Sequence, residues 1–234
     1  MKTVLKLSYK IYMEDLCIVI PTMSRKKNGL EYVKETLAAN TPILNSCNTC
    51  IYVNQTDYDL LRGELAEILH TVIPRTEDDS ALEHLRNDKY AYWRSHLCMD
   101  FFYSMEQATH RFPNCKYFMW LEDDVLLHPN FEEEWANKGN FVWTHNGHGA
   151  TCLIFEKTNL LSIVIPNVKS VYLEDAPIDG ARYDNRWGHP THLSKKIAFH
   201  IGVSSSQEGC IRHENDRAEY SRLKGITKTN NRRA

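Results

Sequence analysis

The residues best suited to chemistry lie together in the segment YFMWLEDDVLLHPNF, at 117–131. Five apolar or aromatic residues are followed directly by three carboxylates, Glu122, Asp123 and Asp124. Neighbouring carboxylates repel one another, so we expect a partner of opposite charge beside them. Hard divalent cations such as Mg²⁺ and Mn²⁺ prefer oxygen ligands of this kind. The alternative is a solvated turn whose acidic side chains cap a helix that begins near Pro129.

The elements that would position these carboxylates follow from the pattern of apolar residues. Runs rich in β-branched and aromatic residues predict strands at 16–20, 49–54, 116–121, 140–146, 150–157 and near 195–202. Helical spacing predicts helices at 28–40, 57–70, 90–111 and 129–138, whereas residues 74–89 look like a loop or frayed turn. The alternation predicts an α/β fold with a mostly parallel central sheet flanked by helices. Ligands of open α/β sheets bind at the carboxyl ends of strands, where the acidic triplet falls.

Length and composition limit the possible classes of protein. The chain has 234 residues, a net charge of −2 and seven cysteines without the spacing of a disulfide framework. No apolar segment approaches the roughly 18 residues of a membrane span. We therefore expect one domain over residues 1–210, followed by a basic tail at 211–234. We also expect a cytoplasmic protein that binds neither nucleic acid nor membrane.

Five segments, taken in order, resemble glycosyltransferases of the GT-A fold, most closely the N-acetylglucosaminyltransferase IV family. They are IPTMSRKKNGLEYVKETL (20–37), YWRSHLCMDF (92–101), YFMWLEDDVLLHPNF (117–131), PIDGARYDNRW (177–187) and FHIGVSSS (199–206). The resemblance implies a Rossmann-like nucleotide-sugar-binding sheet and a metal-dependent, inverting transfer of a sugar to a glycan or glycoprotein. The implied cofactors are Mn²⁺ or Mg²⁺ and a nucleotide-sugar, with UDP as the expected nucleotide. Family members are usually longer and lumenal, so the chain is either a trimmed catalytic domain or a compact, virus-encoded relative.

The resemblance also implies roles for individual residues in the metal site. It makes Asp124 the direct metal ligand and His200 a further metal contact. Glu122 and Asp123 would face the ribose of the donor and the water molecules of the metal. The resemblance therefore implies that the segments at 122–124 and 199–206 meet in space.

Five residues are implied to contact the nucleotide donor: Pro21, Thr22 and Arg25 after the first strand, and Arg94 and Asp100 on the long helix. Arg94 and Asp100 are six residues apart and cannot share one helical face, so at most one points straight at the donor. His96 and Asp100 have the i, i+4 spacing of a side-chain pair.

A transferase of this kind also needs a base that accepts the proton of the attacking hydroxyl. The match in PIDGARYDNRW makes Asp179 the candidate, while Glu174, Asp175 and Asp184 lie close to it in the sequence. The alternative role of Asp179 is the N-cap of a following helix. Among the tryptophans, Trp187 is the candidate for stacking on the acceptor sugar.

Two other functions remain open at this point. A sugar-nucleotidyltransferase would normally carry a glycine-rich phosphate loop after its first strand, but PTMSRKKNG has one late glycine. A catalytically inactive carbohydrate-binding protein would have no need for the clustered charge of the acidic triplet and His200.

Overall fold

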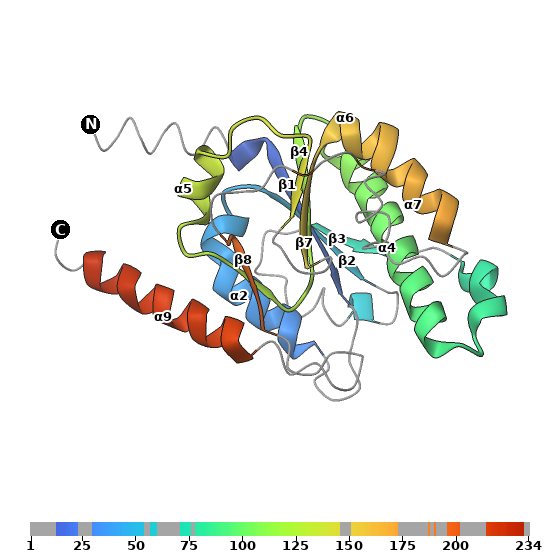
Figure 1. Ribbon diagram of the computed structural model, residues 1–234, viewed down its shortest axis with the longest axis horizontal. Helices are drawn as coiled ribbons and strands as arrows, with labels where there is room; N and C mark the ends of the chain where they lie inside the picture. The colour runs from blue at the N-terminus through green and yellow to red at the C-terminus, as the bar shows by residue number, and fades with distance from the viewer. Residues whose placement is uncertain are drawn as a thin grey trace.

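The centre of the molecule is a six-stranded sheet (Figure 1). The computed structural model describes residues 13–22, 30–53, 57–59, 71–75, 78–145, 151–172, 187, 190, 196–201 and 214–231. The strands are β1 (Leu16–Thr22), β2 (Asn48–Val53), β3 (Thr71–Pro74), β4 (Tyr117–Leu121), β6 (Trp143–His145) and β7 (Cys152–Glu156). Their order is β3-β2-β1-β4-β7-β6, with β3, β2, β1 and β4 parallel, and β7 antiparallel to β4 and β6. The predicted α/β class with a mostly parallel sheet is confirmed.

The inner strands are buried on both faces, as their continuous apolar sequences predict. All five residues of β4 are buried, and β1 is buried at every position except Pro21. Such runs are typical of strands in a parallel sheet that is covered on both sides. β1 continues two residues beyond its predicted end, which brings Thr22 to the carboxyl edge of the sheet.

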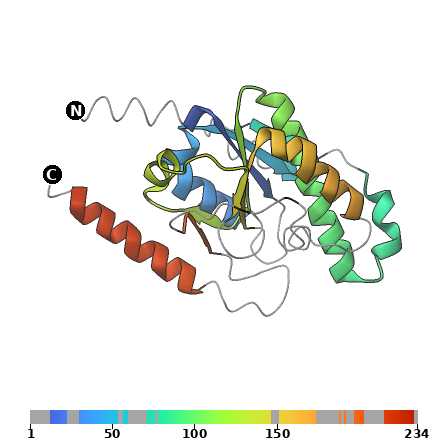
Figure 2. The same cartoon turned by 45° about the horizontal axis from the view of Figure 1, so that its top comes forward.

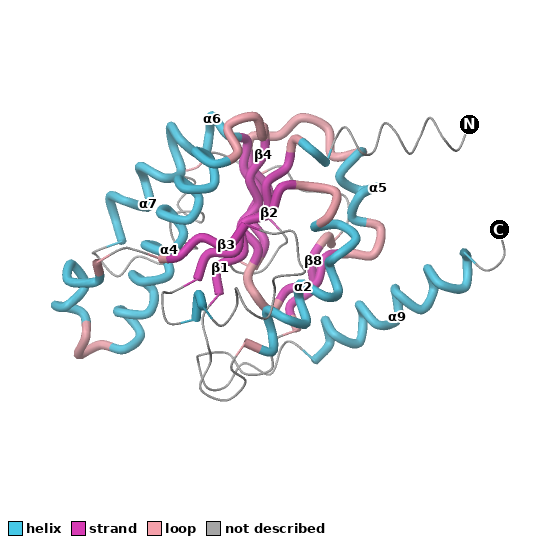
Figure 3. The backbone as a smooth tube through the Cα atoms, turned by 180° about the vertical axis from the view of Figure 1, so that it is seen from behind, coloured by secondary structure: helices cyan, strands magenta, loops and turns pink. Residues whose placement is uncertain are grey.

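Helices cover both faces of the sheet (Figures 1 and 3). α2 (Glu31–Leu44) and α5 (Phe131–Ala136) lie on one side. α4 (Lys89–Arg111) lies on the other with a continuous helical segment formed by α6 (Lys157–Asn159), a π-helical turn (Leu160–Val164) and α7 (Ile165–Val171). Alternate residues of β4 enter the two cores: Met119 belongs to the core that contains Leu37 of α2, and Trp120 packs on Phe101 of α4 in the other.

A small second sheet lies on the α2 side. β5 (Val125–Leu127) follows the acidic triplet and pairs antiparallel with β8 (Ala198–His200). The last element, α9 (Glu214–Asn231), packs its first half against β8, while its far end projects from the body of the molecule (Figure 2). No helix in the part of the chain that the structure describes has the length and apolar character needed to cross a membrane.

Several elements differ from the sequence predictions. The predicted loop at 74–89 contains a 3₁₀ helix (Asp79–Leu85), and β3 precedes it. The β-branched run LLSIVI, for which the sequence pattern predicts no element, is helical and packs against α4 as part of the segment that ends with α7. α5 begins at Phe131, so Pro129 precedes the helix instead of lying in its first turn. Most of the predicted helix at 57–70 lies outside the described residues.

Candidate active site

The three carboxylates form the turn between β4 and β5. β4 ends at Leu121, and the backbone of the turn is held from two sides. The Glu122 N–H donates to the carbonyl of Thr151 at 3.0 Å, and the Ile201 N–H donates to the carbonyl of Asp124 at 2.8 Å. The triplet therefore lies at the carboxyl edge of the sheet, as predicted, with the end of β8 bonded directly to it.

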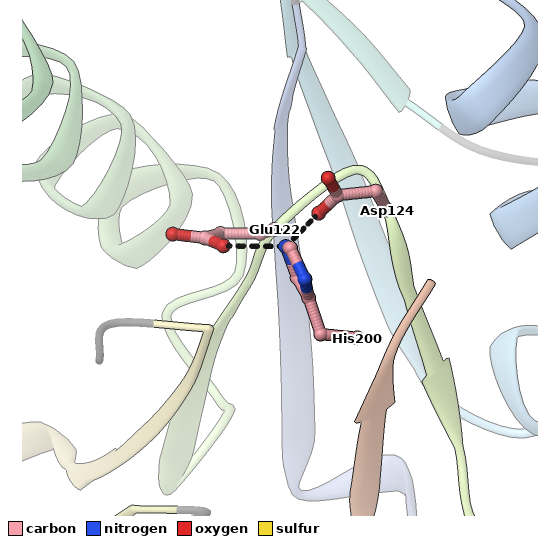
Figure 4. Close-up of side chains that lie close together, drawn as sticks. All are labelled: Glu122, Asp124 and His200. Atoms are coloured by element: carbon pink, nitrogen blue, oxygen red, sulfur yellow. Dashed lines mark ion pairs between the residues drawn. The ribbon is translucent and has the colours of Figure 1, made fainter. Parts of the chain in front are cut away.

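Two of the carboxylates converge on one imidazole (Figure 4). His200 Nε2 lies 2.9 Å from Asp124 Oδ1 and 3.6 Å from Glu122 Oε2. One ligand atom from each of the three residues falls within 4.8 Å of the others. Asp124 is buried, with 2% of its surface exposed, whereas Glu122 and His200 are half-buried. The structure thus brings together Asp124 and His200, the two predicted metal ligands, and adds Glu122 to them.

This donor set fits a divalent cation. An octahedral Mg²⁺ with bonds of roughly 2.0–2.1 Å places neighbouring ligand atoms roughly 2.9 Å apart. The separation of 2.9 Å between His200 Nε2 and Asp124 Oδ1 equals that spacing, whereas the 3.6 Å between His200 Nε2 and Glu122 Oε2 exceeds it. Two carboxylates and one imidazole suit Mn²⁺ or Mg²⁺, and the imidazole favours the softer Mn²⁺. A cation between the carboxylates would also offset their mutual repulsion.

Asp123 takes a different position from its two neighbours. Its carboxylate accepts a hydrogen bond of 2.7 Å from Thr22 Oγ1 at the end of β1. Its backbone carbonyl accepts another, of 2.8 Å, from Thr36 Oγ1 of α2. Asp123 is only 7% exposed, so these bonds lie in the protein interior. Thr22, which the resemblance assigns to the donor, therefore also anchors the acidic turn to β1.

A buried amide of α2 completes the support of the turn. Asn40 Nδ2 donates to the carbonyl of Val125 at 3.0 Å, and its Oδ1 accepts from the Leu127 N–H at 2.9 Å. These backbone groups face away from β8, so the side chain of Asn40 occupies the place of a neighbouring strand on the outer edge of β5. Asn40 and Thr36 are one helical turn apart and both fully buried. One face of α2 therefore fixes the segment that carries the carboxylates.

Asp100 belongs to a second polar cluster at the same edge of the sheet. It contacts Arg75, which follows β3 and whose N–H donates to the carbonyl of Val53 at the end of β2. Arg75 Nε donates to Asp100 Oδ1 at 2.6 Å, and Arg75 Nη2 lies 3.0 Å from His96 Nε2. Because a guanidinium only donates, Nε2 of His96 accepts, and its Nδ1 carries the proton directed at Asp100 Oδ2, 3.3 Å away. The predicted pairing of His96 with Asp100 is confirmed, and Arg94 lies half-buried on the same helix.

The other predicted residues differ in what the structure says of them. Pro21 lies half-buried near the end of β1. Arg25, Asp179 and the neighbouring candidates for the base lie outside the described residues. The prediction that Trp187 stacks on an acceptor sugar is wrong in this structure, because only 1% of its surface is exposed. Its ring stacks on Phe101 and meets Trp143 edge-on, so its indole belongs to the core beside α4.

Burial also controls the thiol beneath the acidic turn. Cys152 lies opposite Leu121 in the sheet and is fully buried. Burial, together with the negative charge of Glu122, raises the pKa of Cys152 to about 12. Because this pKa lies far above physiological pH, Cys152 is a neutral packing residue and does not present the thiolate that a metal would bind.

Sequence reasoning missed Arg75 and the supporting residues of α2. Arg75 directly follows a strand, so the rule that functional groups lie at carboxyl ends of strands would have selected it had β3 been recognised. Asn40 and Thr36 carried no such signal, because polar residues on a helix ordinarily face solvent.

Comparisons with known proteins add three similar structures. No protein-family model and no curated protein matches the chain. It is similar to a glycosyltransferase involved in the glycosylation of the major capsid of PBCV-1, with 13% identity, 87% of this chain and 98% of that chain covered, and a TM-score of 0.45. It is also similar to a mannosyltransferase from Pyrobaculum calidifontis in complex with GDP-Man and Mn²⁺, with 10% identity, 68% of this chain and 53% of that chain covered, and a TM-score of 0.41. The third is the inositol-1-phosphate CTP transferase from T. maritima, with 11% identity, 77% of this chain and 78% of that chain covered, and a TM-score of 0.39. At such low identities and TM-scores, the likeness carries no activity over to this chain.

Proposed function

We propose that the protein is a metal-dependent glycosyltransferase of the GT-A type. It would transfer a sugar from a UDP-sugar donor to a hydroxyl group of a glycan or glycoprotein. One observation carries the proposal: Glu122, Asp124 and His200 converge at the carboxyl edge of a mostly parallel α/β sheet. This edge is where open α/β sheets bind their ligands, and the donor set suits a cation that binds diphosphates.

Asp124 and His200 would hold Mn²⁺ or Mg²⁺, with Glu122 beside them. When bound, the cation supplies a bridge to the donor diphosphate and offsets the charge that develops on the leaving nucleoside diphosphate. His200 can serve as a ligand only through an unprotonated Nε2, since a metal ligand must present a lone pair. The fixed turn at 122–124 keeps the carboxylates in place before the donor arrives, so little reorganisation is needed on binding.

The donor would extend from the metal site along the carboxyl edge of the sheet. Thr22 lies at that edge on β1, and Arg75 lies there beyond β2 and β3 with Asp100 held against it. We propose Pro21, Thr22 and Asp100 as donor-side residues on this ground. Arg25 and Arg94 join them on the strength of the family resemblance.

We propose Asp179 as the general base. It would accept the proton of the acceptor hydroxyl while that oxygen attacks the anomeric carbon and the bond to the nucleoside diphosphate breaks. Attack on the face opposite the leaving group inverts the configuration of the sugar. This assignment rests on the resemblance of PIDGARYDNRW to the family segment.

The test is a panel of nucleotide-sugars, including UDP-N-acetylglucosamine and other UDP- and GDP-sugars, assayed with Mn²⁺ or EDTA. Both slow hydrolysis of the donor and transfer to a mixed glycan acceptor would be measured from the nucleoside diphosphate that they release. We expect activity with one donor that EDTA abolishes and that falls at least about 100-fold in Asp124→Asn. Glu133→Gln, a change at an exposed carboxylate of α5, is the matched control and should retain wild-type activity.

Three outcomes would contradict the proposal. Formation of pyrophosphate from a sugar phosphate and a nucleoside triphosphate, without transfer from any sugar donor, would indicate a nucleotidyltransferase. Metal-dependent binding of a sugar or nucleotide without turnover would indicate an inactive binding protein. Activity that survives in Asp124→Asn would show that the cluster is not the active site.

A further inference from the structure

The first half of α9 connects the elements that carry the candidate metal ligands. Arg217 makes a bidentate ion pair with Glu35 of α2: its Nη1 donates to Oε1 at 2.8 Å and its Nη2 to Oε2 at 2.9 Å. Tyr220 packs edge-on against Phe199 of β8, with ring centroids 5.8 Å apart. α9 therefore bridges β8 to the same helix whose side chains fix the acidic turn.

Asp216 of α9 contacts the backbone of the candidate metal ligand itself. Its Oδ2 accepts a hydrogen bond of 3.1 Å from the His200 N–H, and its Oδ1 accepts one of 2.5 Å from Lys196 Nζ. The N–H of the next residue, Ile201, points the opposite way and bonds to the acidic turn. The His200 N–H therefore lies on the outer edge of β8, and the Asp216 carboxylate occupies the place of a neighbouring strand there.

The β5–β8 ribbon is thus closed by a side chain along each of its long edges. Asn40 bonds the outer edge of β5, and Asp216 bonds the outer edge of β8. A two-stranded ribbon is at best marginally stable by itself, so such edge contacts decide where its residues lie. Asp124 precedes one strand and His200 ends the other, so the ribbon sets the separation of the two ligands.

We propose that Asp216 is a positioning residue for the metal centre, and that α9 is the clamp that keeps His200 at ligand distance from Asp124. This inference rests on the metal site of the proposed function. Asp216 does not coordinate the cation; it holds the backbone from which the imidazole extends. Loss of its carboxylate removes the bond to the His200 N–H and leaves β8 dependent on β5 and on the packing of Tyr220.

The test measures Mn²⁺ affinity without any sugar donor, from the electron paramagnetic resonance signal of unbound Mn²⁺. We expect Asp216→Ala to weaken binding by about 10-fold, as for other residues that orient metal ligands. Asp216→Asn retains an oxygen that can accept from the His200 N–H, so it should recover most of the affinity. Glu219→Ala is the matched control, because Glu219 contacts Lys196 at 3.3 Å on the same helix and makes no bond to His200.

Hydrogen exchange of the peptide 196–201 provides a second readout that needs no metal. Exchange of the His200 amide should be faster in Asp216→Ala than in Glu219→Ala. Wild-type Mn²⁺ affinity in a folded Asp216→Ala protein would overturn the inference, as would equal losses in Asp216→Ala and Glu219→Ala. Absence of Mn²⁺ binding in the wild type would overturn it as well. A wild type that binds Mn²⁺ but transfers no sugar would instead refute the proposed function and leave this inference standing.

Discussion

Replacement of Asn40 by leucine should test how the fold holds the acidic turn. Asn40 lies fully buried on α2 and makes two hydrogen bonds to the backbone of β5, one to the Val125 carbonyl and one from the Leu127 N–H. Leucine has a similar shape and can make neither bond. The substitution therefore leaves one buried acceptor and one buried donor of the main chain without their partner.

The expected loss of stability follows from these two groups. A buried polar group that loses its hydrogen-bond partner costs roughly 1–3 kcal/mol, so two such groups cost about 2–6 kcal/mol. A domain of this kind has an unfolding free energy of about 5–15 kcal/mol, so the change is a large fraction of the total. Asn40→Leu should therefore lower the midpoint of urea unfolding strongly, with little change in the slope of the transition.

The matched control is Asn137→Ala. Asn137 also bonds a backbone carbonyl, that of Glu133 at 2.8 Å, but its side chain is exposed, so water replaces the lost partner. Its substitution should change the unfolding free energy by less than about 0.5 kcal/mol. A loss below about 1 kcal/mol in Asn40→Leu would refute the view that Asn40 serves as a strand partner for β5.

Further predictions at three residues concern stability and the state of ionisable groups. Thr22→Val removes the hydrogen bond to the buried Asp123 carboxylate and should lower the unfolding free energy by about 2 kcal/mol in urea titrations. Thr22→Ser keeps the hydroxyl and should retain most of the wild-type stability. Cys152, whose pKa burial raises from 9.0 to about 12, should be alkylated at pH 8 on the order of 10³-fold more slowly than in the unfolded chain, as judged by peptide mass spectrometry. Because the pKa of Cys152 is higher in the folded protein than in the unfolded chain, the stabilising contribution of its neutral thiol is complete below pH 9 and is lost as the pH rises toward 12. If the wild type instead gained stability over this range relative to Cys152→Ser, the assignment would be contradicted. Arg75→Ala leaves the half-buried carboxylate of Asp100 without its cation. It should lower stability by about 2 kcal/mol, between the values for exposed and fully buried ion pairs, and adding Asp100→Asn should restore part of the loss in thermal unfolding.

The elements at the centre of the fold could be predicted from the sequence because buried strands and helices have characteristic runs and spacings of apolar residues. The run Tyr117–Leu121 is apolar throughout because β4 is covered on both faces, and the carboxylates that follow it mark the edge of the sheet. Leu30, Val33 and Leu37 have helical spacing because they share the buried face of α2. Periodicity of this kind depends only on neighbouring residues, so it can be seen in one sequence.

The remaining features depend on contacts between distant parts of the chain. Nothing in the sequence near His200 indicates that it meets Asp124, so only the family resemblance suggested the pair. Asn40 looks like a solvent-facing residue of α2, and its role is set by where β5 passes. The helix α9 was predicted as a basic tail, because its composition is polar and its contacts with β8 involve few residues, Tyr220 foremost among them.

The most direct test of the central claim is calorimetric titration of Mn²⁺ into the protein in the presence of UDP. The cluster of Glu122, Asp124 and His200 predicts one Mn²⁺ per chain in the wild type and in the Glu133→Gln control. It also predicts affinity at least about 10-fold weaker in His200→Ala and weaker still in Asp124→Asn. Undiminished Mn²⁺ affinity in both variants, or no binding of Mn²⁺ to the wild type, would contradict the assignment of this cluster as the metal centre.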